Sequence, residues 1–187
     1  LPIVSRRQRQ MCIRDRSNIE KKRVKRNPIP PFTTSTLQQE ASRKLGFSAY
    51  KTMRVAQKLY EGINLNKETS GLITYMRTDG VQISQEAITN IREFISNEYG
   101  KNFIPESPRY YKSKAANAQE AHEAIRPTNF NYSPKLISKY LDKDQLKLYD
   151  LIWKRTLSSQ MASAELDKTT VDIKSKDNSI TFRTNGS

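Results

Sequence analysis

The chain has 187 residues, with 33 Lys/Arg against 19 Asp/Glu, which gives a formal net charge of +14. This length suits one domain plus part of another, and the charge points to a polyanionic partner such as nucleic acid. With Cys12 as the single cysteine, a disulfide framework is excluded. No apolar run reaches the roughly 18 residues of a membrane span, so we expect a cytoplasmic protein without a membrane partner.

Residues 1–31 are expected to form a basic tail without regular structure. They carry ten Lys/Arg against two acids and end in the proline-rich run Asn27–Pro31, which marks a domain boundary. Within them, Val4–Arg16 resembles a leader translated from sequencing-adapter DNA, which would make residues 1–16 foreign to the natural protein. Because the chain starts with Leu1 rather than Met, we expect a fragment of a longer protein.

Two helices joined by a short turn are predicted next. Thr34 or Ser35 can cap a helix through about Leu45, and Ser48 can cap a second one through about Glu61. The second helix has an apolar stripe that we expect to be buried: Met53, Ala56, Leu59 and Tyr60. Such a pair forms a helix-turn-helix-like unit. Its basic residues could contact DNA phosphates or simply face solvent: Lys51 and Arg54.

The stretch Gly71–Gly80 (GLITYMRTDG) carries the candidate chemistry. If it is extended, Tyr75 and Arg77 share one face and Met76 points away from them. A phenol can attack a phosphodiester, and a guanidinium can hold the phosphate oxygens and stabilise their developing charge. A half-buried strand tyrosine beside a solvated arginine explains the same pattern.

A third helix is predicted from Ser84 to Gly100, with a buried stripe of isoleucines: Ile88, Ile91 and Ile95. The irregular segment that follows interleaves aromatic and basic residues: Tyr110, Tyr111 and Lys112. Such residues can stack on bases and hold phosphates, or they can pack on the domain surface.

Residues 118–126 are predicted to form a short helix that ends at Pro127. They contain His122, the only histidine of the chain, which could contact a phosphate, shuttle a proton or serve the structure. With one His and one Cys, no ordinary zinc site can be built, and we predict no metal ligands.

The last predicted elements are a helix and two strands. The amphipathic helix covers 142–160, and its inward residues are Leu146, Tyr149, Ile152, Trp153 and Leu157. Period-two alternation predicts strands over 170–174 and 180–183.

Three motifs in one order identify a resemblance. Gly71–Asp79 resembles the nucleophile motif of bacterial type IA DNA topoisomerases. Thr36–Gln39 before it and Gln119–Thr128 after it match the same family. Met76 resembles the bacterial topoisomerase I branch, whereas Gly80 stands where the family usually has Ser.

The resemblance implies a mainly α (α+β) fold, with a helical nucleophile domain over 32–161 that contains helix-turn-helix-like (CAP-like) elements. Incomplete strands of the arch-forming domain would flank it, including 162–187. By the same resemblance Tyr75 is the nucleophile that becomes joined to a 5′-phosphate, Arg77 stabilises the transition state, and His122 contacts the scissile phosphate. The expected DNA contacts are Thr36, Gln38, Gln39, Thr78 and Arg126, together with Lys51 and Arg54.

The family relaxes negative supercoils without ATP, and its Mg²⁺ is held by a toprim domain that has no counterpart in these 187 residues. The resemblance therefore implies a monomer with two partners, single-stranded DNA at the nucleoid and its own toprim domain, and an isolated chain that does not turn over. Two alternatives remain open: a non-enzymatic helix-turn-helix DNA-binding module, and a basic RNA- or ribosome-associated domain.

Overall fold

The computed structural model describes residues 14–65, 69–112, 122–175 and 180–186. It divides into two compact units, one made of the residues up to Asn27 and from Ser163 onward, the other of Pro28–Ala162. The limits expected for the helical domain, 32–161, lie next to these boundaries. In the described part of the chain, no helix is both long and apolar enough to cross a membrane.

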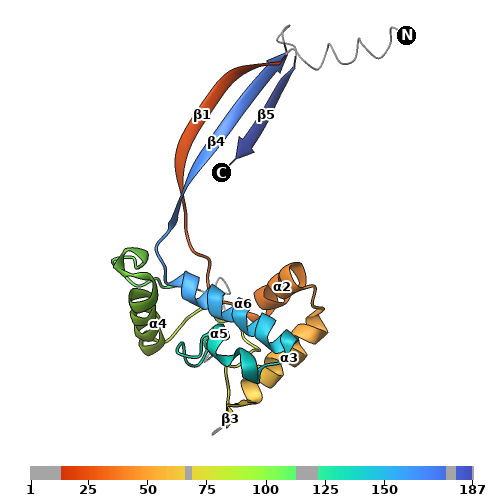
Figure 1. Ribbon diagram of the computed structural model, residues 1–187, viewed down its shortest axis with the longest axis vertical. Helices are drawn as coiled ribbons and strands as arrows, with labels where there is room; N and C mark the ends of the chain where they lie inside the picture. The colour runs from red at the N-terminus through yellow and green to blue at the C-terminus, as the bar shows by residue number, and fades with distance from the viewer. Residues whose placement is uncertain (1–13, 66–68, 113–121, 176–179, 187) are drawn as a thin grey trace, which may run out of the picture. The chain divides into compact units, whose positions relative to one another are not determined.

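The first unit is a three-stranded antiparallel sheet in the order β1-β4-β5 (Figure 1). The strands are β1 (Arg14–Arg26), β4 (Ala164–Ser175) and β5 (Thr181–Gly186). Strand β4 pairs with β1 from Arg26↔Ala164 to Arg14↔Ser175. The two strands predicted near the C-terminus are present, although β4 begins earlier than position 170.

The expectation of an irregular tail is wrong for residues 14–26, which form β1; residues 1–13 lie outside the described residues. The hydrogen-bond partner of β1 is β4, more than 100 positions away in the sequence, and a local pattern cannot reveal it. Opposite charges face each other across the two strands, with Arg23 3.6 Å from Asp167. Because both side chains are exposed, this pair adds little, and the backbone ladder holds the strand.

The second unit contains five helices among its described residues (Figure 1). They are α2 (Thr34–Leu45), α3 (Ala49–Glu61), α4 (Gln85–Tyr99), α5 (Pro134–Ile137) and α6 (Lys143–Ser159). Two 3₁₀ turns, Lys101–Phe103 and Ser138–Tyr140, follow α4 and α5. A two-stranded ladder of β2 (Ile63–Asn64) and β3 (Thr69–Ser70) follows α3. The mixed, mainly helical fold class is confirmed.

Helix N-termini follow the predicted capping residues closely. Ser48 caps α3 and Ser84 caps α4, as predicted. Helix α2 begins one residue earlier than expected, because Thr33 is its N-cap. The hydroxyl of Thr36 accepts a hydrogen bond from the Thr33 amide at 2.9 Å, which completes a capping box.

The core of this unit lies where α6 crosses α2 and α3 (Figure 1). The predicted inward residues Tyr149, Ile152, Trp153 and Leu157 are buried, whereas Leu146 is only half-buried. The Tyr149 hydroxyl donates to the Tyr132 carbonyl at 2.8 Å. Burial raises the pKa of Tyr149 above its ordinary value, so this phenol stays neutral.

The predicted helix over 118–126 is wrong in its described part, since residues 122–126 are not helical and Ile125 forms an isolated β-bridge with Phe32; residues 118–121 lie outside the described residues. The Ile125 amide donates to the Phe32 carbonyl at 2.8 Å, and the Ala124 amide donates to the Gln82 carbonyl at 2.9 Å. Ala124 and Ile125 are fully buried. Pairing with two distant segments therefore satisfies this backbone in place of a helix.

Candidate active site

Two segments that are distant in the sequence pair side by side and position Tyr75. The Thr74 amide donates to the Arg126 carbonyl at 2.9 Å, and the Thr128 amide donates to the Leu72 carbonyl at 3.1 Å. The Thr74 hydroxyl donates to the Ala124 carbonyl at 2.8 Å and accepts from the Arg126 amide at 3.0 Å. The residue before Tyr75 is thus held through both its backbone and its side chain.

The end of α3 supports the same stretch from another direction. The Leu72 amide donates to the Leu59 carbonyl at 2.8 Å. Next to it, a Cβ added at Gly71 would lie 2.6 Å from the Tyr60 carbonyl oxygen. Only glycine permits this close approach, so the residue type at position 71 helps to set the position of Tyr75.

Exposure alternates along the central stretch. Tyr75 is 37% exposed and Met76 is 1% exposed, whereas Arg77 is exposed and Thr78 is buried. Tyr75 and Arg77 therefore face solvent and Met76 enters the core, as the extended pattern predicts.

The first residue of α2 fixes the backbone on both sides of Arg77. The Thr34 hydroxyl lies 2.8 Å from the Met76 carbonyl and 3.1 Å from the Thr78 carbonyl, and can donate to either. It also accepts from the Thr78 amide at 2.8 Å. In addition, the Thr34 amide donates to the Thr78 carbonyl at 2.9 Å. Sequence reasoning missed Thr34 as a site residue; the run of hydroxyl residues over 33–36 was the available signal.

Three exposed rings form a row at the site. The Tyr75 ring lies 5.3 Å from the His122 ring and 5.5 Å from the Tyr60 ring, between centroids. Tyr60 is 40% exposed, so its predicted place in the buried stripe of α3 is wrong; the stripe uses Val55 instead. The structure thus brings together Tyr75 and His122, which are 47 positions apart.

Arg126, predicted to contact DNA, is already engaged inside the unit. Its Nη2 lies 2.6 Å from Glu123 Oε2, and its Nη1 donates to the Pro127 carbonyl at 3.0 Å. The other oxygen of Glu123 accepts from the Ser84 amide at 3.0 Å. Through Glu123, the segment that follows His122 is therefore bonded to Ser84, the N-cap of α4.

The remaining predicted DNA contacts lie on α2, on α3 and beside Arg77. Lys51 pairs with Asp144 at 2.7 Å, and the Arg54 guanidinium lies 6.0 Å from the Tyr50 ring. The polar candidates differ in exposure: Gln39 and Thr36 are exposed, Gln38 is half-buried and Thr78 is buried. Thr36 also serves the α2 cap.

The described residues do not fit a magnesium ion. They contain no group of three or more His, Cys, Asp or Glu residues that could hold a metal. Glu123, the acid next to His122, is occupied by Arg126 and the Ser84 amide. A carboxylate held in this way is a poor ligand for a hard cation that prefers several oxygen atoms.

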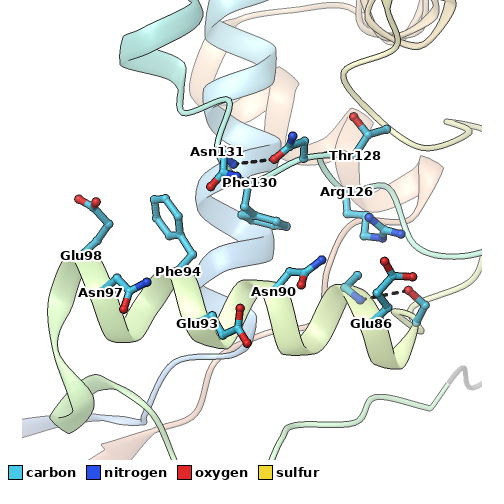
Figure 2. A pocket seen from close by; sticks show the side chains of 13 residues that line it. Glu86, Asn90, Glu93, Phe94, Asn97, Glu98, Arg126, Thr128, Phe130 and Asn131 are labelled. Carbon is cyan, nitrogen blue, oxygen red and sulfur yellow. Dashed lines mark hydrogen bonds between the residues drawn. The ribbon is translucent and has the colours of Figure 1, made fainter.

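A polar groove of about 590 Å³ runs along α4 beside the segment 126–131 (Figure 2). Figure 2 shows Glu86, Glu93 and Glu98 on the helix, with Arg126 at one end. Because three carboxylates outnumber one guanidinium, this groove repels a phosphate backbone.

Comparisons with known proteins agree with the arrangement. The model of the DNA topoisomerase family matches residues 8–187. The sequence is 59% identical over 169 residues to DNA topoisomerase 1 of Rickettsia bellii, and 53% identical over 171 residues to that of Xylella fastidiosa. These alignments cover 90% and 91% of this chain, which spans about a fifth (21%) of the length of each curated relative.

The fold is similar to that of full-length topoisomerase I from Thermotoga maritima. The TM-score is 0.79 at 38% sequence identity, and the match covers 99% of this chain and 29% of that one. Fold and sequence together define a DNA topoisomerase. The chain belongs to this family, in its bacterial type IA branch.

Proposed function

We propose that the full-length protein containing this chain relaxes negatively supercoiled DNA without ATP, and that Tyr75 is its nucleophile. It would act as a monomer on the chromosome in the bacterial cytoplasm. The observation that carries the proposal is the exposed Tyr75 ring, which lies 5.3 Å from His122 on a backbone held from three sides. Arg77 is exposed on the same face.

The chemistry follows from these groups. The Tyr75 phenol oxygen attacks the phosphorus of one DNA strand, a tyrosine–phosphorus bond forms and the bond to the 3′-oxygen breaks. The phenol proton leaves, and the 3′-oxygen takes up a proton. A phenol with a pKa of about 10 needs a positive field and a proton acceptor at neutral pH. Arg77 supplies the charge at the phosphate, and His122 contacts the same phosphate or relays the proton.

The 5′-phosphotyrosine bond conserves the energy of the phosphodiester, so the 3′-hydroxyl can reverse the attack after strand passage. The described residues offer no magnesium site, and we propose that a toprim domain elsewhere in the full-length protein binds Mg²⁺. The 187-residue chain should then bind single-stranded DNA without relaxing a plasmid. Relaxation by the chain alone would contradict this division of the active site.

The decisive experiment follows the label on a cleaved strand. The full-length protein is mixed with an oligonucleotide labelled at its 3′ end, and covalent adducts are resolved by denaturing electrophoresis. We expect an adduct that carries the 3′ label, whereas a 5′ label is released on a free fragment. Tyr75→Phe should abolish the adduct, and the neighbouring Tyr60→Phe, which keeps its ring beside Tyr75, should retain it. An adduct formed by the Tyr75→Phe variant would remove Tyr75 from this role.

The alternative of a non-enzymatic helix-turn-helix module is not favoured. It uses α2 and α3 to read a duplex and gives no reason for an exposed row of Tyr60, Tyr75 and His122. Binding that prefers duplex over single-stranded DNA would revive it.

A further inference from the structure

A second cavity borders the segment that follows the central stretch. It has a volume of about 370 Å³ and is formed by residues 81–83, the start of α4 and residues 109–112. Its floor includes Ile88, 2% exposed, and Gln160, fully buried. All ten lining residues are described, and none of them is acidic.

The Tyr110 side chain lines this cavity and is anchored by its hydroxyl. Tyr110 is 65% exposed, yet its hydroxyl donates to Gln85 Oε1 at 2.8 Å. Gln85 is the first residue of α4, so a rigid element holds the ring. The hydrogen bond engages the oxygen of the Gln85 amide, and its NH₂ group can still donate to a ligand.

The backbone beside Tyr110 is also anchored. The Gln160 side chain accepts from the Arg109 amide at 3.1 Å and donates to the Arg109 carbonyl at 2.8 Å. The Tyr111 hydroxyl donates to the Ser159 carbonyl at 2.8 Å, and burial raises the pKa of Tyr111, which keeps that donor protonated. A loop held at both flanks of Tyr110 loses little entropy when a ligand binds.

The polar groups of the cavity suit a nucleotide. Lys112 is exposed and can meet a phosphate, while the exposed Gln82 and Gln85 carry amides that can bond to base edges. Arg109 adds positive charge, although its Nε donates to the Met161 carbonyl at 3.0 Å. In contrast, the larger groove on the opposite flank of α4 contains three carboxylates and cannot serve this purpose.

We propose that this cavity is a second subsite for single-stranded DNA, in which Tyr110 stacks on an unpaired base, Lys112 holds the adjoining phosphate and Gln82 contacts the base edge. The proposal rests on DNA being the substrate of the full-length protein. The Gln82 carbonyl accepts from the Ala124 amide at 2.9 Å, so the segment that lines the subsite is bonded to the segment that follows His122.

Binding is tested with the 187-residue chain carrying Tyr75→Phe and a fluorescein-labelled single strand of about 12 nucleotides. Fluorescence anisotropy should show about tenfold weaker binding for Tyr110→Ala, because base–aromatic stacking is lost. Tyr110→Phe keeps the ring and should stay within about threefold. Tyr99→Ala is the matched control, since Tyr99 is 45% exposed at the opposite end of α4. Equal losses for Tyr110→Ala and Tyr99→Ala, or no loss for Tyr110→Ala, would overturn the subsite.

Two further readouts locate the strand. Lys112→Ala should lower the slope of log affinity against log salt by about one, as expected for one phosphate contact. Photocrosslinking with a 5-iodouracil strand should label the peptide that contains Tyr110; labelling confined to other peptides would contradict the proposal. Neither readout uses the phenol of Tyr75. The proposed subsite can therefore be refuted while the proposed cleavage by Tyr75 holds, and cleavage by Tyr75 can be refuted while the subsite holds.

Discussion

Substituting Gly71 by alanine should slow DNA cleavage as well as lower the stability of the chain. A new Cβ would lie 2.6 Å from the Tyr60 carbonyl oxygen, whereas a relaxed carbon–oxygen contact is about 3.3 Å. The two backbones must therefore separate by about 0.7 Å, at a cost of about 1–3 kcal/mol. This movement stretches the hydrogen bond between Leu72 and Leu59 and displaces Tyr75. A misplacement near 1 Å can cost about 100-fold in rate, so we expect a 10- to 100-fold slower cleavage.

Gly46→Ala is the matched control for this experiment. Gly46 has a φ of 68° and no atom within 4 Å of an added Cβ, so alanine there suffers about 1 kcal/mol of backbone strain without a clash. Urea unfolding should show a loss of stability for both variants. Single-turnover cleavage by the full-length protein should be slow only for Gly71→Ala. If Gly71→Ala cleaves at the normal rate, or if Gly46→Ala is equally slow, the proposed positioning of Tyr75 by Gly71 is refuted.

Three further changes test the supports of the site. Thr34→Val keeps the side-chain shape but removes the hydroxyl that bonds to the Thr78 amide, which should destabilise the chain by about 1–3 kcal/mol in urea unfolding and slow cleavage. An unchanged stability and cleavage rate would refute this role of Thr34. Glu123→Gln should release Arg126 and thereby slow the cleavage of 3′-labelled DNA. A normal cleavage rate would contradict this role of Glu123. Burial opposes ionisation of Glu40, but Lys44 and other cations outweigh it and hold its pKa below the ordinary 4.5. Its stabilisation is therefore present above about pH 4.5 and is lost as pH falls through the lower folded pKa, so Glu40→Gln should lower the Tm at pH 7 but not at acid pH.

Local sequence signals predicted α2, α3, α4 and α6 well, because the causes of these helices are local. Ser48 and Ser84 each accept a hydrogen bond from an amide three residues on, and the isoleucine stripe of α4 is buried as its spacing predicts. The alternation around Tyr75 was also readable, since a buried Met76 follows from the period of an extended chain.

The errors arose where a distant partner overrides local preference. Residues 14–26 have a composition typical of a solvated tail, yet they pair with β4. Residues 122–126 contain helix-forming Ala and Glu, yet their amides donate to Phe32 and Gln82. Tyr60 fits the apolar period of α3, but its ring is exposed and lies beside Tyr75 instead of in the core.

The sequence by itself determined the family, the chemical groups and the face that Tyr75 shares with Arg77, because motifs and periodicity are properties of neighbouring residues. Only the tertiary structure decided what surrounds that face. The Tyr75 ring lies beside His122, and hydrogen bonds between segments about 40 to 50 positions apart fix the backbone around Tyr75. Their formation depends on a core that closes these long loops, and no local pattern encodes that closure.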